Sequence, residues 1–242
     1  MSLQPILEAA RLIREEAGRL SVFDQDEQEF MACVMRNLNR SNAQLFQDVW
    51  VLFETGFKSG GYFVEFGACD GVSHSNTLML EKLYGWSGIL AEPAHVWIND
   101  LVFNRSCHID RRCVFKESGK KLIFNQVPGT YATLSTIDEF SDRDTWAEDR
   151  KLGKRYEVET ISLADLLRAH NAPYDIDYLS VDTEGSELDI LSVFDFTMYN
   201  IKCISVEHNR TIYRDEIFKF LGSKGYRRKF TRLSNWDDWY IK

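Results

Sequence analysis

Four acidic residues and one histidine come at or just after the ends of short apolar segments that have the composition of buried strands. They are Glu92, Asp182, Glu184, Glu207 and His208. Carboxylates and imidazoles accept protons, and an aliphatic hydroxyl, about as weakly acidic as water at pKa ~15.7, must lose its proton when it reacts as a nucleophile. Ligands of parallel α/β sheets bind beyond the carboxyl ends of the strands, so we expect these side chains to converge on one cleft. The first hypothesis is a site that activates a hydroxyl.

Two assignments of roles within this group are open. In the first, Asp182 or His208 is the general base, while Glu184 and Glu207 position the acceptor or tune that base. Imidazole titrates near neutral pH unaided, whereas a carboxyl needs a raised pKa or a charged partner. In the second, the group holds a divalent cation, magnesium or manganese, with Asp182, Glu207 and His208 as candidate ligands. A strand-end turn whose acids only cap the following helix is the structural alternative for 182–185.

The segment 62–71, Tyr-Phe-Val-Glu-Phe-Gly-Ala-Cys-Asp-Gly, has the pattern of a buried strand that runs into a tight turn. Gly67 and Gly71 allow the backbone to turn and a ligand to approach closely. A dinucleotide site would have two more glycines after Gly67, but the chain has Cys69 and Val72 at those positions. The turn therefore argues against NAD.

The acidic residues near this turn favour S-adenosylmethionine as the cofactor. Asp70 would repel a phosphate, and S-adenosylmethionine has none. It has instead an ammonium and a sulfonium cation, for which Glu65 and Asp70 are favourable neighbours. Glu92 lies 25 residues after Gly67, at the end of the next expected strand, where its carboxylate can accept hydrogen bonds from both ribose hydroxyls. A structural turn with surface acids is the alternative interpretation.

Short segments in and around these strands carry a family resemblance. They are Phe63-Val64-Glu65-Phe66-Gly67-Ala68-Cys69-Asp70-Gly71, Ser75-Asn76-Thr77, Gly88-Ile89-Leu90-Ala91-Glu92-Pro93, Ser180-Val181-Asp182-Thr183-Glu184-Gly185-Ser186-Glu187 and Val206-Glu207-His208-Asn209. Together they resemble the FkbM family of S-adenosylmethionine-dependent methyltransferases over about residues 41–230. The resemblance implies a class I methyltransferase fold, with a Rossmann-like doubly wound sheet, and O-methylation, commonly of sugar or polyketide hydroxyls.

The turn and the resemblance together give a set of expected cofactor-binding residues. They are Glu65, Gly67, Ala68, Asp70, Gly71, Ser75, Asn76, Glu92, Pro93, Glu117, Ser118 and Asp182. Glu117 and Ser118 follow the third expected strand, where class I enzymes hold adenine. Acceptor choice is expected in loops such as 126–157, of which the charge-dense part 141–155 is predicted to be a mobile excursion. Trp236 and Trp239 either form a sugar-stacking face or pack in the core.

Apolar strand segments that alternate with helical segments predict an α/β domain with a mostly parallel, doubly wound sheet. We expect this methyltransferase domain over 41–242, preceded by a helical extension over 1–40. In that extension an apolar stripe from Leu3 to Leu20 repeats every three to four residues. The stripe either packs on the domain or forms a homo-oligomer seam.

The composition excludes several classes of protein. The chain has 242 residues and a net charge of -8, which disfavours a protein that wraps nucleic acid. Its five cysteines are dispersed without ligand spacing, which is typical of reduced thiols. No apolar run approaches a membrane span, and no signal peptide pattern begins the sequence. We expect a cytoplasmic protein.

The function predicted from the sequence is S-adenosylmethionine-dependent O-methyl transfer to a small-molecule or glycan acceptor. A catalytically silent module that binds S-adenosylmethionine or a glycan on the same fold is the alternative. An NAD-dependent reductase is a more distant one, because of the residues at Cys69 and Val72.

Overall fold

The computed structural model describes residues 7–8, 11 and 23–242 of the chain. The chain divides into two units, 1–40 and 41–242. The apolar stripe from Leu3 to Leu20 lies outside the described residues, so the predicted helix and the homo-oligomer seam on it stay predictions.

Helix α2 (Gln25–Asn37) is the described helix of the first unit. It begins with a capping box: the Asp24 carboxylate accepts a hydrogen bond from the Glu27 N–H, and the Glu27 carboxylate accepts one from the Asp24 N–H. These two bonds satisfy backbone donors that have no partner within the helix.

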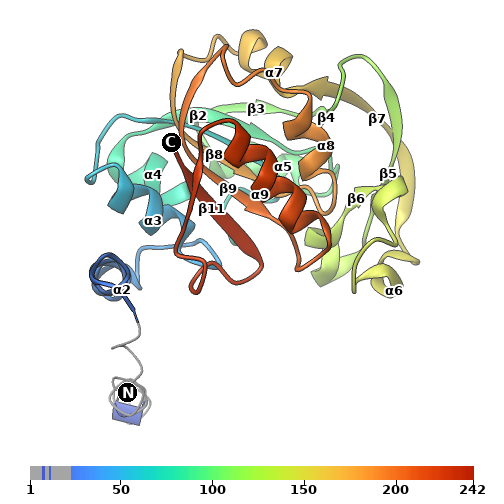
Figure 1. Cartoon of the computed structure of the whole chain (residues 1–242). Coiled ribbons are helices and arrows are strands. Elements are labelled where there is room, and N and C mark those ends of the chain that lie inside the picture. Colours follow the sequence, from blue (N-terminus) through green and yellow to red (C-terminus); the bar gives the residue numbers. More distant parts are fainter. Residues whose placement is uncertain (1–6, 9–10, 12–22) are drawn as a thin grey trace. The chain divides into compact units, whose positions relative to one another are not determined.

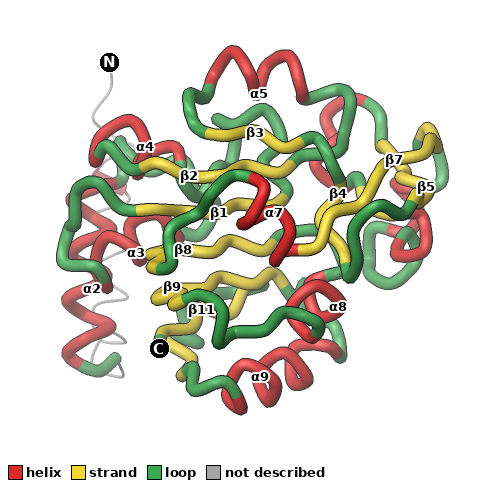
Figure 2. Tube along the Cα trace, turned by 90° about the horizontal axis from the view of Figure 1, so that it is seen from above, coloured by secondary structure: helices red, strands yellow, loops and turns green. Residues whose placement is uncertain are grey.

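The second unit is built on a seven-stranded sheet with the order β10-β11-β9-β8-β1-β2-β3. Its strands are β1 (Tyr62–Phe66), β2 (Ser87–Ala91), β3 (His108–Asp110), β8 (Asp175–Val181), β9 (Asn200–Glu207), β10 (Arg227–Lys229) and β11 (Asp237–Ile241). Figure 2 shows the strands from β3 to β11 side by side in this order. The five from β3 to β9 are parallel, whereas β11 is antiparallel to both β9 and β10. The predicted mixed α/β fold with a mostly parallel sheet is confirmed.

The path of the chain through this sheet defines where a ligand can bind. From β1 the chain moves outward to β2 and β3, and it later returns to β8 on the other side of β1. The carboxyl ends of β1 and β8 therefore diverge into connections that leave in opposite directions. Such a reversal of strand order opens a crevice at the carboxyl edge of a parallel sheet.

Helices pack on both faces of the sheet, which explains why its central strands are continuous apolar runs. They are α3 (Gln47–Glu54), α4 (Leu78–Tyr84), α5 (Ile98–Asn104), α7 (Leu163–Ala169), α8 (Glu187–Ser192) and α9 (Tyr213–Ser223). On one face Leu166, Leu191 and Leu221, from α7, α8 and α9, join one hydrophobic core with the sheet (Figure 1). On the other face Trp50 of α3 stacks on Trp239 of β11, with ring centroids 5.1 Å apart. In the described ranges no helix is both long and apolar enough to cross a membrane.

A second, four-stranded sheet stands beyond the carboxyl ends of the parallel strands, at the right of Figure 2. Its order is β4-β7-β5-β6. It comprises β4 (Cys113–Phe115), β5 (Lys121–Gln126), β6 (Thr136–Ile137) and β7 (Lys154–Ser162), with the short helices η1 (Gly129–Leu134), η2 (Asp138–Phe140) and α6 (Ala147–Arg150). Its apolar side chains, among them Phe124, Phe140 and Val158, form a core of their own. This sheet supplies the outer wall of the candidate site.

Candidate active site

A cavity of about 640 Å³ opens at the carboxyl ends of β1, β2, β8 and β9, where the strand order reverses. Ten of the predicted site residues line it: Glu65, Gly67, Ala68, Ser75, Asn76, Glu92, Pro93, Asp182, Glu184 and Glu207. Five others lie outside its wall: Asp70, Gly71, Glu117, Ser118 and His208. The cavity thus brings together residues that are far apart in the sequence.

The turn after β1 fits tightly against the end of β8. Gly67 has φ +72°, a conformation that glycine adopts without strain, and its N–H donates to the Ala91 carbonyl oxygen at 3.1 Å. A Cβ at this position would lie 2.1 Å from the backbone oxygen of Asp182. The close contact between the turn and β8 therefore requires glycine.

Asp70 closes the turn instead of facing the cavity. Its carboxylate accepts hydrogen bonds from the backbone N–H groups of Val72 and Ser73 at 2.8 and 2.7 Å, and from the Ser73 hydroxyl. Burial alone would raise the pKa of Asp70, but these bonds outweigh it and lower the pKa. Gly71 packs against Leu101 of α5, whose Cδ1 would lie 2.7 Å from an added Cβ.

Glu65 holds the segment that follows the turn. Its buried carboxylate accepts hydrogen bonds from the Asn76 N–H at 2.8 Å, the Ser75 hydroxyl at 3.1 Å and the Thr77 hydroxyl. Burial raises the pKa of Glu65, and the guanidinium of Arg105, 3.9 Å away, opposes that rise. The carboxylate therefore positions Ser75 and Asn76, which line the cavity.

Arg105 is a positioning residue that the sequence analysis did not identify. Its side chain has no exposed surface, and it donates to the Glu81 carboxylate at 2.7 Å and to the Gly71 carbonyl oxygen at 3.1 Å. Arg105, at the end of α5, thereby links that helix to α4 and to the turn that follows β1. A lone arginine in a polar segment has the sequence pattern of a surface residue, and nothing in its neighbours signals the buried ion pair.

Glu92 presents a carboxylate at the end of β2. Its two oxygens accept hydrogen bonds from the Cys69 N–H at 2.9 Å and the Ala94 N–H at 2.7 Å. Burial raises its pKa to about 7, although both bonds favour the ionised form. A carboxylate has about four acceptor positions, so two remain for the hydroxyls of a bound diol. Trp97 and Val114 also line the cavity and contribute apolar side chains to its wall.

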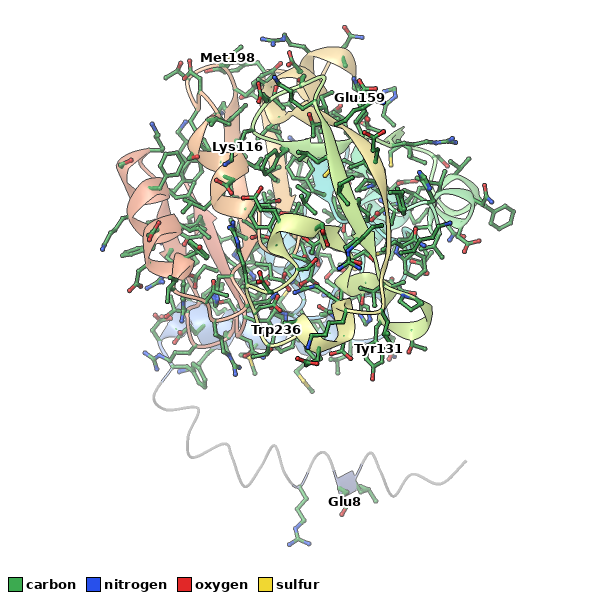
Figure 3. All side chains as sticks on the ribbon, turned by 90° about the vertical axis from the view of Figure 1, so that its right-hand side faces the viewer. Glu8, Lys116, Tyr131, Glu159, Met198 and Trp236 are labelled. Atoms are coloured by element: carbon green, nitrogen blue, oxygen red, sulfur yellow. The ribbon has the colours of Figure 1, made fainter. Side chains whose placement is uncertain are left out.

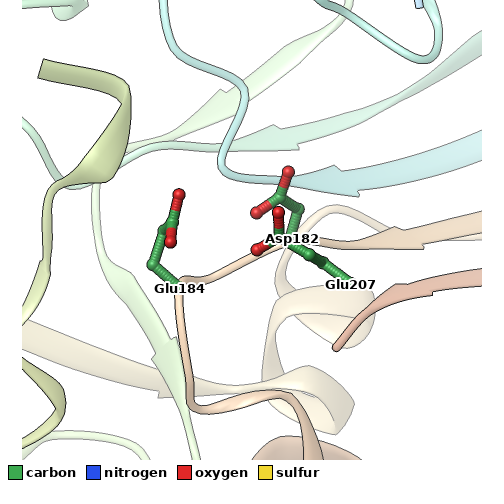
Figure 4. A group of neighbouring side chains, drawn as sticks. All are labelled: Asp182, Glu184 and Glu207. Carbon is green, nitrogen blue, oxygen red and sulfur yellow. The ribbon is translucent and has the colours of Figure 1, made fainter. Parts of the chain in front are cut away.

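Asp182, Glu184 and Glu207 form an acidic cluster in the wall of the same cavity, and Figure 4 shows them close together. Each contributes one carboxylate oxygen to a group whose members all lie within 4.8 Å of one another. Burial raises the pKa of Asp182 to about 7. It raises the pKa values of Glu184 and Glu207 further, because the charge of Asp182 adds to the effect of burial.

His208 is turned away from this cluster. Its Nδ1 accepts a hydrogen bond from the Arg210 N–H at 2.9 Å, and its Nε2 lies 3.8 Å from an oxygen of Asp238. Glu207 lines both the large cavity and a second one of about 330 Å³, whereas His208 lines the second and not the first. The structure thus places Glu184, and not His208, beside Asp182 and Glu207.

Glu117 and Ser118 lie at the surface near the start of α7 and make contacts there. The Ser118 hydroxyl accepts a hydrogen bond from the Ser162 N–H at 2.9 Å. The exposed Glu117 carboxylate lies 3.7 Å from the Lys120 ammonium group. Strand β4 instead contributes Cys113 and Val114 to the cavity wall.

The segment 141–155, predicted to be a mobile excursion, is held in place by the buried arginine Arg150. That expectation is corrected. Arg150 has no exposed side-chain surface, and its guanidinium donates to the Leu134 carbonyl oxygen at 2.8 Å. It also pairs with the carboxylates of Asp144 at 2.6 Å and Glu184 at 2.8 Å. Trp146, in the same segment, lines the cavity.

The two tryptophans proposed for acceptor contact have different surroundings. Trp236 lines the cavity, and its backbone oxygen accepts hydrogen bonds from the N–H groups of His208 and Asn209. Figure 3 shows it at the same edge of the domain as Tyr131. Trp239 is fully buried in the core of the sheet.

Comparisons with known proteins agree with the resemblance found in the sequence. The sequence model of the Methyltransferase FkbM domain matches residues 65–228. The crystal structure of methyltransferase FkbM from Methylobacillus flagellatus KT aligns with 12% sequence identity and a TM-score of 0.47. That alignment covers 87% of this chain and 60% of the other, so the chain spans little more than half the length of that protein. No curated protein sequence matches the chain.

Proposed function

Because the chain belongs to the FkbM methyltransferase family, we propose that it is an S-adenosylmethionine-dependent O-methyltransferase for a sugar, glycan or natural-product hydroxyl. The observation that carries the proposal is that one cavity is lined both by Glu92 and by the acidic cluster of Asp182, Glu184 and Glu207. The reversal of strand order between β1 and β8 supports the class I doubly wound arrangement.

The residues of the cavity fit this methyl donor. Glu92 has acceptor positions for the ribose hydroxyls, and Trp97 and Val114 add apolar side chains to the same cavity for a purine ring. The turn at Gly67 lacks the glycines of a pyrophosphate site, and carboxylates predominate among the charged groups of the wall. When bound, S-adenosylmethionine supplies an electrophilic methyl group attached to a sulfonium cation, which such a wall stabilises.

The chain's own residues align the acceptor and accept its proton. Alignment of two reactants can supply up to ~7–11 kcal/mol of the activation barrier. Methyl transfer would form a carbon–oxygen bond as the carbon–sulfur bond of the donor breaks and a neutral thioether leaves. The Asp182 carboxylate would accept the hydroxyl proton, with Glu184 and Glu207 orienting the acceptor. We assign this role to Asp182 over His208 because Asp182 lines the cavity and His208 lines the other one.

Titration calorimetry and a methyl-transfer assay test this function. We expect the protein to bind S-adenosylmethionine and not NADH, and to transfer the methyl group to an acceptor in a panel of sugars and polyketide alcohols. Asp182→Asn should retain cofactor binding and lose ~10²–10⁴-fold in rate. The control Asp189→Asn removes a carboxylate that pairs with Lys116 outside the large cavity, and it should leave both properties unchanged.

Failure to bind S-adenosylmethionine, or near-normal turnover of Asp182→Asn, would overturn the proposal. Binding without transfer to any acceptor would favour the catalytically silent module instead.

A further inference from the structure

The acidic cluster has more negative charge than its surroundings neutralise. Among the described residues, Arg150 is the one cationic side chain that forms an ion pair with Asp182, Glu184 or Glu207. When all three carboxylates are ionised, one positive charge therefore faces three negative charges, which leaves two in excess. Buried charges without partners are costly, so the trio can be fully ionised only when a further positive charge lies beside it.

Glu207 provides the second observation. It is 8% exposed, and within the described part of the chain its Oε2 is a buried acceptor with no hydrogen-bond donor. Figure 4 shows its carboxyl group extending toward Asp182, on the side where Glu184 also lies. Buried acceptors are nearly always satisfied in folded proteins, and one without a donor needs an explanation.

A neighbouring carboxylate shows that the same turn can satisfy a buried acid completely. Glu187 is 6% exposed, and its Oε1 accepts hydrogen bonds from the Thr183 N–H at 2.9 Å, the Thr183 hydroxyl at 3.0 Å and the Gly185 N–H at 3.0 Å. The backbone donors of the turn are thus directed away from the cluster. Glu207 is left with an open position that faces the cavity.

We propose that Asp182, Glu184 and Glu207 bind one divalent cation of the class that prefers oxygen ligands, Mg²⁺ or Mn²⁺. Two oxygens bound to one such cation are ~3–4 Å apart, which the spread of the trio allows with a small inward movement. Three carboxylates leave the other coordination positions open to water and to the acceptor hydroxyl. His208 takes no part, because it does not line the large cavity and its Nδ1 already accepts a hydrogen bond from the Arg210 N–H.

The role of the cation rests on the proposed function, whereas its binding does not. A hydroxyl that contacts a bound divalent cation loses its proton more readily. If each carboxylate binds through one oxygen, the second oxygen of Asp182 remains available to accept that proton.

The proposal is tested by treating the full chain with chelator, removing the chelator, and titrating the protein with Mn²⁺ alone. Electron paramagnetic resonance measures how much Mn²⁺ is bound. We expect one saturable site per chain, with at least tenfold weaker binding in Glu207→Gln and in Asp182→Asn. Glu139→Gln is the matched control, because this acid pairs with Arg143 at 3.3 Å outside the large cavity. Absence of saturable binding to the unaltered chain, or unchanged affinity in both cluster variants, overturns the proposal.

Thermal unfolding of the same samples separates a lost site from a lost fold. Mn²⁺ should raise the unfolding midpoint of the unaltered chain and of Glu139→Gln, but not that of Glu207→Gln, because a ligand stabilises only the state that binds it. If Glu207→Gln does not fold, Asp182→Asn carries the same comparison. An equal rise in the variants and the unaltered chain overturns the site.

Titration with S-adenosylhomocysteine in the presence of chelator distinguishes this proposal from the proposed function. Binding of the nucleoside without any Mn²⁺ site refutes the cation and leaves the methyltransferase proposal standing. A Mn²⁺ site without binding of S-adenosylhomocysteine supports the cation site and refutes the methyltransferase proposal.

Discussion

Two arginines with no exposed side-chain surface hold the acidic groups around the cavity. Arg105 lies beside Glu65 and pairs with Glu81, and Arg150 pairs with Asp144 and Glu184. Each neutralises charge that burial would otherwise make costly, and each joins segments that are distant in the sequence. The carboxylates of the site are thus kept in place by residues that do not themselves resemble catalytic groups.

At the residue scale, the proposed role of Glu92 in binding the ribose can be measured directly. Glu92→Gln removes one charge-assisted acceptor for the ribose hydroxyls, and affinity for S-adenosylhomocysteine should fall by about 10- to 100-fold. Glu117→Gln is the control, since that carboxylate is exposed at the surface. Titration calorimetry of both variants checks the difference. Equal losses in both, or no loss in Glu92→Gln, would place the ribose elsewhere.

Some site residues could be predicted from the sequence because strand ends in a parallel sheet meet at one edge. This rule located Glu92, Asp182 and Glu207 at one cavity. It could not choose between neighbours such as Glu207 and His208, because the pattern leaves open which of two adjacent side chains faces the cavity. Arg105 and Arg150 could not be found at all, since Glu81 and Glu184, with which they pair, come from other segments.

At the element scale, apolar runs predicted β1, β2, β8 and β9 of the large sheet, but not its short strand β3. The third expected strand, near Cys113–Phe115, is β4 of the second sheet. The second sheet was predicted only as isolated short segments, because its strands are partly exposed and pair over long separations. The segment 141–155 has the composition of a solvated loop, and only the surroundings of Arg150 reveal that it is anchored. Charge density alone therefore misjudged an element that forms part of the site wall.

The contact between the turn after β1 and the end of β8 is tested by replacing two glycines that have similar φ angles, Gly67 and Gly85. Gly67→Ala puts a Cβ against the Asp182 backbone oxygen, whereas at Gly85 no atom lies within 4 Å of an added Cβ. Both have positive φ, so Gly85→Ala reports the conformational cost alone, about 1–2 kcal/mol. Gly67→Ala should cost at least about 3 kcal/mol and abolish S-adenosylhomocysteine binding. Equal costs in chemical denaturation would show that the turn can move away from β8.

Arg150, the last residue of α6, is predicted to hold the segment 141–153 against the domain. Arg150→Met leaves the carboxylates of Asp144 and Glu184 buried without their partner, which should cost about 3–5 kcal/mol of unfolding free energy. Lys151→Met removes an exposed cation that pairs with Glu148, and it should cost less than about 1 kcal/mol. Chemical denaturation gives both values, and limited proteolysis should cleave 141–153 faster only in Arg150→Met. Similar stability of the two variants would argue against the anchor.

At the scale of the whole molecule, the domain accommodates several buried carboxyl groups whose pKa values are raised. Burial raises the pKa of Asp48 to about 6 and that of Glu92 to about 7. The folded state therefore binds more protons than the unfolded state from about pH 4 up to about pH 7. His208, whose pKa burial lowers, has the opposite effect, but it is a single group and acts below about pH 6.5.

The free energy of unfolding should consequently fall as the pH rises from 6 to 8, by about 1 kcal/mol or more. Above the folded-state pKa values the curve should level off. Denaturant titrations at pH 6, 7 and 8 measure the slope, and Glu92→Gln should make it shallower because that group no longer titrates. Stability that increases over this range would contradict the protonation of these buried acids.

Strand β11 lies between β9 and β10, although it follows both in the chain. During synthesis on the ribosome, β9 therefore keeps a bare edge until residues 237–241 have been made. A bare strand edge can pair with strands of other molecules, so the nascent chain has a period of exposure to aggregation. The same late strand begins with Asp237, which accepts a hydrogen bond from Gln47 of α3 at 2.7 Å and lines the cavity. The cavity is therefore complete only after β11, which is translated later than β9 and β10, has paired with β9 and met Gln47 of α3.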